Sequence, residues 1–170
     1  MVGKLVEEAG GPKMFIDRLE EQLIEGVASL DEVVGCTAEE IALIELTYKR
    51  RLPEVYKAFL AKMGRSAGKL FEDTEAYYPA LLGFRARAEE LLLAEEGRLS
   101  LPDDAIVFLL HQGYVFAFFS GSDDDPIVQF YEEGTGEIST YGKRLSEILA
   151  TETESYVAFD GQIRQGLVRQ

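Results

Sequence analysis

The sequence predicts a single α+β domain in which helices cover a mostly antiparallel sheet of about four to six strands. Residues 37–64 have the apolar periodicity of two successive amphipathic helices. Residues 105–141 contain short apolar runs separated by glycine-containing turns, which is typical of an antiparallel sheet. The chain has 170 residues, of which 46% are hydrophobic, and this suits one well-packed core better than two.

Residues 1–36 are expected to form a helical N-terminal extension. Pro12 suits the first turn of a helix, where its missing N–H costs nothing. One face of this helix carries an apolar stripe, which can dock on the rest of the chain or bind a partner. Docking is favoured because an exposed apolar stripe promotes aggregation. The stripe consists of Phe15, Leu19, Leu23 and Val27, which recur at a four-residue spacing.

The helix pair over residues 37–64 carries several mutually consistent signals. Thr37 is followed three residues later by Glu40, which is the spacing of a capping box. Pro53 disfavours helix at the residue before it and suits the start of the second helix. Gly64 suits the left-handed conformation that often ends a helix. The positions expected to face the core are Ile41, Ile44, Tyr48 and Leu52 in the first helix and Val55, Tyr56, Phe59, Leu60 and Met63 in the second.

The second half of the chain predicts a helix followed by a meander of strands. A helix is expected over residues 81–96, ended by Gly97, after a loop with at most one short strand over 65–78. The apolar runs at 105–110 and 114–119 are uninterrupted, which indicates strands covered on both faces. Further strands are expected at 127–131 and 137–141. A closing helix then carries Leu145 and Leu149, and residues 151–170 are expected to form a tail that packs on the domain through Tyr156 and Phe159.

The charge of the chain restricts its partners. Its formal net charge is −14, from 31 acidic and 17 basic residues. A negative surface repels phosphate backbones and anionic lipids, so we expect neither a nucleic acid nor a membrane partner. Acidic surfaces also keep proteins soluble, and that explanation accounts for much of the charge. The more specific interpretation is a cationic protein partner.

No catalytic, cofactor or metal site is expected. Cys36 and His111 are the only residues of their types, so one chain can form neither a disulfide nor a Cys/His zinc site. There is no nucleophile elbow or phosphate-binding glycine loop, and His111 is interpreted as a turn residue. The acidic loop at 123–125 lacks the spacing of a calcium loop. Without a signal sequence or an apolar run of about 20 residues, the chain is expected to be cytoplasmic.

Several short motifs resemble the SUKH superfamily, which includes a yeast cell-wall assembly regulator and many bacterial immunity proteins. The resemblance covers residues 37–150 and assigns a SUKH-like fold to them. It implies a non-enzymatic protein-binding domain, specifically an immunity protein that neutralises a toxin, often a basic nuclease. The matching motifs are Glu40-Ile41 with Glu45, the block 52–60 that begins Leu52-Pro53, Leu101-Pro102-Asp103-Asp104, His111-Gln112-Gly113-Tyr114, and Asp125-Pro126-Ile127-Val128.

Two alternatives to immunity stay open at this point. One is a housekeeping scaffold or regulator that binds host proteins, as the yeast relatives do. The other is a small-ligand binder in the cleft between sheet and helices, which a pocket holding His111 and a carboxylate would favour. Oligomeric state does not follow from the sequence.

The predicted contact surface combines acidic residues with two tyrosines. Complementary charge accelerates association with a basic partner, and buried aromatic residues contribute much of the binding energy. Most aromatic residues are expected in the core, but Tyr77 and Tyr78 lie in a loop beside acidic residues. The predicted partner-binding residues are Glu72, Asp73, Glu75, Tyr77, Tyr78, Asp123, Asp124, Asp125, Glu132 and Glu133.

Overall fold

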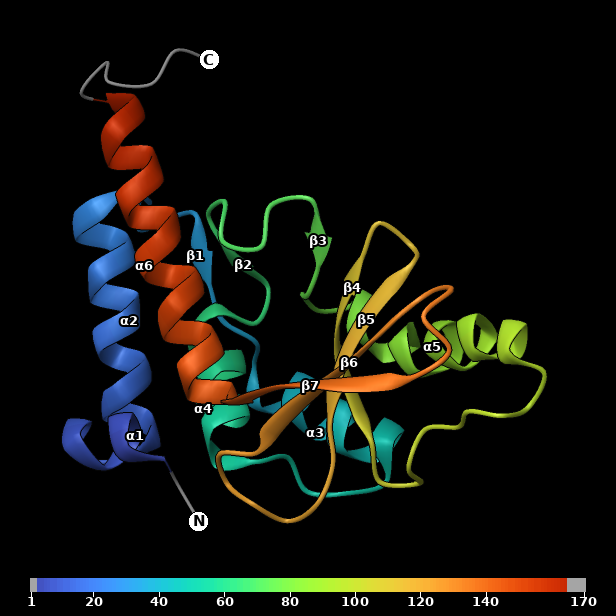
Figure 1. Ribbon diagram of the computed structural model, residues 1–170. Coiled ribbons are helices and arrows are strands. Elements are labelled where there is room, and N and C mark those ends of the chain that lie inside the picture. The colour runs from blue at the N-terminus through green and yellow to red at the C-terminus, as the bar shows by residue number, and fades with distance from the viewer. Residues whose placement is uncertain (1–2, 165–170) are drawn as a thin grey trace.

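The computed structural model describes residues 3–164 and confirms the α+β fold (Figure 1). Its main feature is a five-stranded antiparallel sheet in the order β3-β4-β5-β6-β7, so the strands form a simple meander. A separate two-stranded sheet joins β1 (Val33–Val34) and β2 (Ser66–Ala67). The strands of the large sheet are β3 (Thr74–Glu75), β4 (Ile106–His111), β5 (Val115–Phe119), β6 (Ile127–Glu132) and β7 (Ile138–Arg144).

Helices precede the five-stranded sheet in the chain, lie between β3 and β4, and follow β7. The capping box is confirmed, because the Thr37 N–H donates to Glu40 Oε2 at 2.9 Å and the Glu40 N–H donates to Thr37 Oγ1 at 3.3 Å. The helix predicted over 81–96 is a 3-10 turn, an α-helix and a second 3-10 turn in succession. The helices are α1 (Lys4–Ala9), α2 (Pro12–Gly26), α3 (Ala38–Tyr48), α4 (Glu54–Met63), η1 (Ala80–Gly83), α5 (Phe84–Leu92), η2 (Leu93–Glu95) and α6 (Leu145–Arg164).

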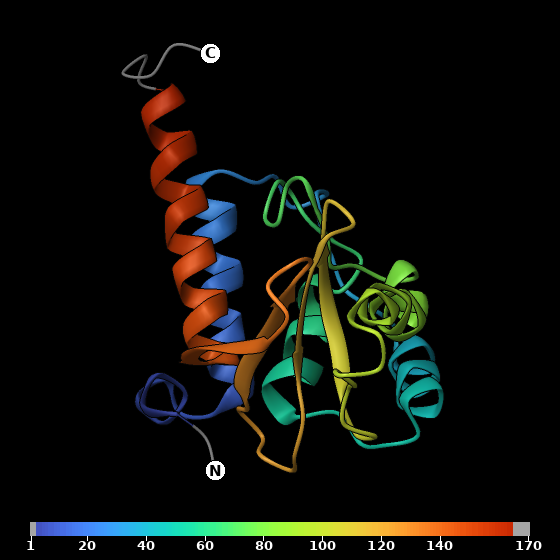
Figure 2. The same cartoon turned by 45° about the vertical axis from the view of Figure 1, so that its right-hand side comes forward.

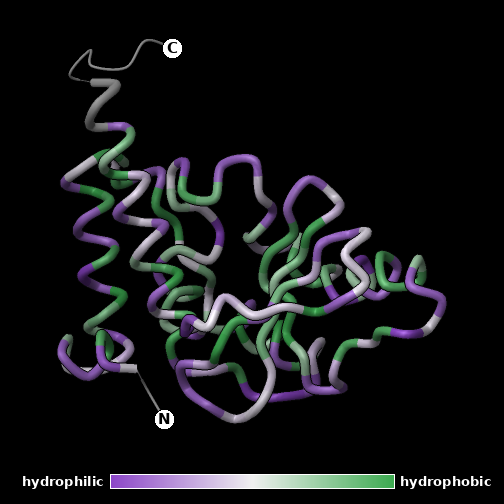
Figure 3. Tube along the Cα trace, in the orientation of Figure 1, coloured by the Kyte–Doolittle hydropathy of each residue, from purple (hydrophilic) through white to green (hydrophobic). Residues whose placement is uncertain are grey.

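The sheet lies between two helical layers, with α4 and α6 on one side and α5 on the other (Figures 1 and 2). On the first face, the Tyr56 ring of α4 meets Phe108 and Phe119 edge-on, with ring centroids 6.1 and 5.3 Å apart. On the second face, Phe116 and Tyr131 are fully buried. Coverage on both faces explains the uninterrupted apolar runs of β4 and β5, and Figure 3 shows the hydrophobic residues gathered in these central strands.

Helices α2 and α6 pack against each other and against α4. The apolar stripe of α2 is buried, and α2 contacts both α4 and α6. Gly26 permits a close approach to α6, since a Cβ there would lie 2.8 Å from a methyl group of Val157. Residues 151–164 continue α6 as helix, beyond the closing helix that the sequence predicts. Phe159 is 57% exposed rather than packed, because it lies off the stripe formed by Thr153 and Val157. Residues 165–170 of the predicted tail lie outside the described residues.

Two local predictions in the helix pair are wrong. Pro53 is the N-cap of α4 and not its first residue, with an extended ψ of 142°. Gly64 has φ −69° and is therefore right-handed. Position 64 requires glycine because there is no room for a side chain: a Cβ would lie 2.5 Å from Cys36 Sγ and 2.5 Å from the Leu60 carbonyl oxygen. Among the helices of residues 3–164, none is long and apolar enough to cross a membrane.

Candidate functional site

The acidic loop between β5 and β6 does not offer Asp125 to a partner. Asp125 is 0% exposed, which corrects the expectation that it lies on the surface. One carboxylate oxygen accepts a hydrogen bond from the Ser146 N–H at 2.9 Å. The other accepts from the Gly3 N–H at 3.0 Å and from Ser146 Oγ at 2.7 Å. Asp125 therefore satisfies a free N–H at the start of α6 and ties the N-terminal segment to it.

The rest of this loop is also held by internal contacts. Arg144 lies 3.6 Å from a carboxylate oxygen of Asp123 and donates a hydrogen bond to the Asp125 carbonyl. The Val55 N–H of α4 donates to the Asp124 carbonyl at 3.0 Å. Both Asp123 and Asp124 are half-buried. The loop is thus fixed to α4 and to β7.

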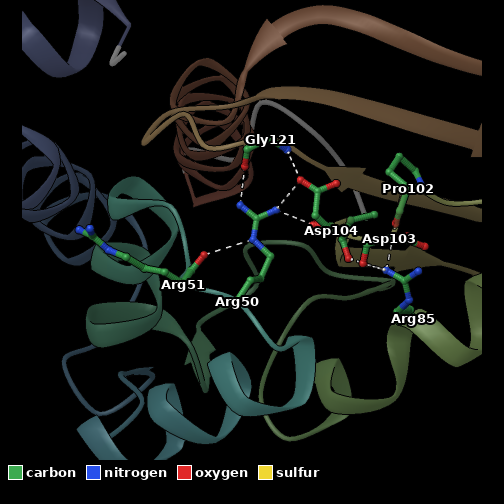
Figure 4. A network of polar contacts seen from close by, with 8 residues as sticks. Arg50, Arg51, Arg85, Pro102, Asp103, Asp104 and Gly121 are labelled. Carbon is green, nitrogen blue, oxygen red and sulfur yellow. Dashed lines mark hydrogen bonds and ion pairs between the residues drawn. The ribbon is translucent and has the colours of Figure 1, made fainter.

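An arginine network fixes the start of the same loop (Figure 4). Arg50, which follows α3, donates to the Gly121 carbonyl and to both the carbonyl and, at 3.2 Å, the carboxylate of Asp104. The Gly121 N–H donates to the Asp104 carboxylate at 2.8 Å. On the other side, Arg85 of α5 donates to the carbonyl groups of Pro102 and Ala105 at 3.2 and 3.0 Å. These contacts fix the Leu-Pro-Asp-Asp segment between two helices.

In the second predicted contact segment, residues 72–78, several side chains also form contacts within the protein. Glu75 accepts two hydrogen bonds from Arg87, at 2.8 and 2.7 Å, and this pairing lowers the pKa of Glu75. The Tyr77 hydroxyl donates to the Leu70 carbonyl at 2.6 Å. The Tyr78 ring lies 5.5 Å from the Arg65 guanidinium. Both tyrosines are half-buried, so they are less available than predicted, whereas Glu72 and Asp73 are exposed.

The strand register separates the predicted residues into two groups. Thr74 pairs with His111, His111 with Val115, and Val115 with Glu132, so these residues form one row across four strands. Glu75 and Glu133 adjoin that row. The loop 123–125 follows the opposite end of β5 and therefore lies at the other end of the sheet. The ten predicted residues do not form one surface.

A groove opens at the end of the sheet where this row lies. Helix α4 covers the part of this sheet face around Phe119 through Tyr56. The part around the row from Thr74 to Glu132 is left open between the strands and α6. The groove has a volume of about 550 Å³. Its floor is largely apolar, and Phe71, Thr74 and residues of α6 form its walls. The lining residues are Phe71, Thr74, Phe108, Leu109, His111, Tyr114, Val115, Ala117, Val128, Phe130, Glu132, Tyr141, Lys143, Ile148, Thr151 and Glu152.

Polar and aromatic groups converge on this groove. His111 Nδ1 lies 2.8 Å from Thr74 Oγ1, and the His111 ring meets Tyr114 edge-on with centroids 5.9 Å apart. The Phe130 and Tyr141 rings are stacked, with centroids 4.2 Å apart and an angle of 19° between their planes. Tyr141 is 49% exposed. Burial of part of its ring, together with the nearby carboxylates of Glu152 and Glu132, raises the pKa of Tyr141.

The groove carboxylates differ from those of the loop because they are not paired. Within residues 3–164, neither the Glu132 nor the Glu152 carboxylate forms an ion pair or hydrogen bond with another side chain. Lys143, also on the groove wall, is exposed and is likewise not paired in this part of the chain. An open apolar surface with charged groups at its rim can bind a polypeptide segment of complementary chemistry.

Metal binding and thiol chemistry find no support in the geometry. No group of three or more potential ligands from His, Cys, Asp and Glu occurs in the part of the chain that the structure describes. Cys36 is buried, and burial together with the Glu40 charge raises the pKa of its thiol to about 11. The thiol is therefore protonated at neutral pH and a poor nucleophile.

Most residues of the groove cannot be identified from the sequence. Phe130, Tyr141 and Glu152 come from two strands and a helix, and their proximity depends on the folding of α6 over the sheet. One signal was available, since Val128, Phe130 and Glu132 alternate along β6 and must share a face. The sequence predicts His111 only as a turn residue and Tyr114 only as the first residue of the strand 114–119.

Comparisons with known proteins place the chain in a family. The family model described as SMI1 / KNR4 family (SUKH-1) matches residues 35–151, which is more than half of the chain. No curated protein sequence matches it significantly.

Proposed function

The chain belongs to the SMI1 / KNR4 family (SUKH-1), and from this premise we propose that it is a non-enzymatic immunity protein that binds and neutralises a basic toxin in the bacterial cytoplasm. The resemblance to immunity proteins of the SUKH superfamily supports this function. The net charge of −14 supports a cationic partner, because complementary charge accelerates encounter and disfavours wrong partners.

The open groove is the observation that carries the proposal. It exposes aromatic and apolar side chains on a sheet face that helices cover elsewhere, and a monomer gains nothing in stability from leaving them uncovered. Tyr114 and Tyr141 are 38% and 49% exposed there. Tyrosine is favoured in protein interfaces because it combines a large apolar body with a polar tip. We therefore assign the centre of the contact to the groove.

The other predicted contact residues take a peripheral place in the proposal. Glu132 belongs to the groove itself. Glu72, Asp73 and Glu133 are exposed near the same end of the sheet, and their role as rim contacts stays a prediction, as does that of Asp123 and Asp124 at the other end. Rim charges mainly affect the association rate and its salt dependence.

Binding of a small ligand is a second candidate function. It is favoured by one observation, namely that His111 shares the groove with the carboxylates of Glu132 and Glu152. Thr74 engages Nδ1 of His111, which leaves Nε2 for a ligand. A housekeeping scaffold that binds host proteins is the other alternative, and it would use the same surface chemistry.

The proposal is tested by capture of partners from lysate of the source organism on the immobilised full chain, with elution by a salt gradient. The immunity function predicts one basic protein that elutes late, that is toxic when expressed alone, and that is harmless when co-expressed with this chain. Several host proteins without toxicity would contradict immunity and support the scaffold function. No captured protein, together with a metabolite bound to the purified chain, would support the small-ligand function.

A further inference from the structure

The stacked pair Phe130–Tyr141 presents an aromatic surface that packing of the core does not require. The rings lie on adjacent strands, β6 and β7, with centroids 4.2 Å apart. Phe130 is half-buried, whereas Tyr141 is 49% exposed and lies on the edge strand of the sheet. One face of the pair is therefore open to the groove. The open face of an aromatic ring attracts cations, and arginine more often than lysine.

Charge near this pair is negative on two sides. Glu132 ends β6 and Glu152 lies on α6, and both line the groove. The two carboxylates lie close enough to Tyr141 to raise its pKa, in addition to the effect of burial. Among the described residues, Lys143 is the one cation on the groove wall, so the two carboxylates outnumber it. A planar guanidinium, which stacks on rings and donates to carboxylates at once, matches this arrangement better than an ammonium does.

Beside the aromatic pair, the floor of the groove is apolar and suits an uncharged side chain of a bound segment. Leu109 and Val115 are half-buried and line the groove, and Ile148 of α6 lines it as well. The volume of about 550 Å³ exceeds what one guanidinium occupies. A bound segment would thus place an apolar side chain next to its arginine.

We propose that the groove binds a polypeptide segment of the partner in which an arginine stands next to an aliphatic residue. The guanidinium stacks on Tyr141 of the Phe130–Tyr141 pair between the carboxylates of Glu132 and Glu152, and the aliphatic side chain lies on the floor formed by Leu109 and Val115. This inference rests on the proposed function, because a protein partner must carry the segment.

The first test titrates the ¹⁵N-labelled full chain with the peptide acetyl-Leu-Arg-Leu-amide and monitors chemical shifts. A matched peptide with citrulline in place of arginine keeps the shape and removes the charge. We expect shifts at residues of β6, β7 and α6 that line the groove, and an affinity about tenfold weaker for the citrulline peptide. Equal affinities, shifts confined to the loop 122–126, or no shifts up to the solubility of the peptide would overturn the proposal.

Variants locate the site within the groove. We expect Glu152→Gln and Tyr141→Leu each to weaken binding of the arginine peptide several-fold. The matched control is Glu154→Gln, an exposed glutamate on α6 that does not line the groove, and it should leave the affinity unchanged. A control variant that weakens binding as much as Glu152→Gln would point to general electrostatic attraction and would overturn the assignment. Thermal unfolding of each variant verifies that it is folded.

The same variants separate this inference from the proposed function. If the captured toxin binds Tyr141→Leu as tightly as the unmodified chain, the groove assignment fails while the immunity function stands. If the arginine peptide binds in the groove but no protein is captured, the immunity function fails and the chemistry of the groove stands.

Discussion

Two acidic regions of this protein, the loop 122–126 and the groove over β6, β7 and α6, use their carboxylates in opposite ways. In the loop, Asp125 is buried under three hydrogen bonds and Asp123 faces Arg144. In the groove, Glu132 and Glu152 pair with no other side chain of the described residues and flank an exposed tyrosine. A cluster of acids in a sequence therefore does not indicate which carboxylates are available to a partner.

The largest effect is expected for Asp125→Ala. It leaves the Ser146 N–H and hydroxyl and the Gly3 N–H without their buried acceptor, and buried charge-assisted hydrogen bonds are costly to remove. We expect the free energy of unfolding to fall by about 3 kcal/mol. Urea denaturation measures it, with Asp124→Ala as the control in the same loop. A loss no larger than that of the control would show that Asp125 does not hold the loop.

A smaller loss is expected for Arg50→Met. Methionine keeps the apolar stem but removes the donors that join Asp104 and Gly121. We expect the free energy of unfolding to fall by about 1–2 kcal/mol and the exchange of the Gly121 amide proton to accelerate. Urea denaturation and hydrogen exchange measure the two effects. Unchanged exchange at Gly121 would contradict the role of Arg50 in fixing the loop.

Acid should remove the contribution of Glu45 to the stability of the fold. Burial opposes ionisation of Glu45, but the Leu52 N–H and Lys57 outweigh it and lower the pKa below the usual 4.5. A carboxyl with a lowered folded-state pKa stabilises the fold above its unfolded pKa, and this contribution is lost as the pH falls through the folded-state value. We expect the free energy of unfolding to decline below pH 4.5, and less steeply in Glu45→Gln. Identical pH profiles would contradict this contribution.

The smallest effect concerns the titration of Tyr141. Burial raises its pKa first, and the Glu152 and Glu132 charges raise it further. We expect Glu152→Gln to lower the pKa of Tyr141 toward 10.0 without removing the shift, because the ring stays partly buried. Ring proton shifts of Tyr141 against pH measure this. An unchanged pKa would show that Glu152 points away from the stacked pair. The free energy of unfolding should change by less than about 0.5 kcal/mol.

Most of the fold follows from local signals in the sequence. The capping box at Thr37, the proline before α4 and the alternation of apolar runs and turns are set by neighbours in the chain, and these elements were predicted within a few residues. The candidate site depends instead on long-range packing. Asp125 is buried because α6 and residue 3 fold over it, and the groove exists because α4 covers only part of a sheet face. No local pattern reports either arrangement.

The most direct test of the groove as the contact surface compares two double variants for affinity to the captured partner. One is Asp123→Asn with Asp124→Asn in the loop, and the other is Tyr141→Leu with Glu152→Gln in the groove; each pair lowers the affinity only if its region forms the contact. We expect at least a tenfold loss for the groove variant, about 1.4 kcal/mol, and less than a twofold loss for the loop variant, because Asp123 and Asp124 act only as rim contacts. A large loss for the loop variant with an unaffected groove variant would contradict the groove as the contact surface.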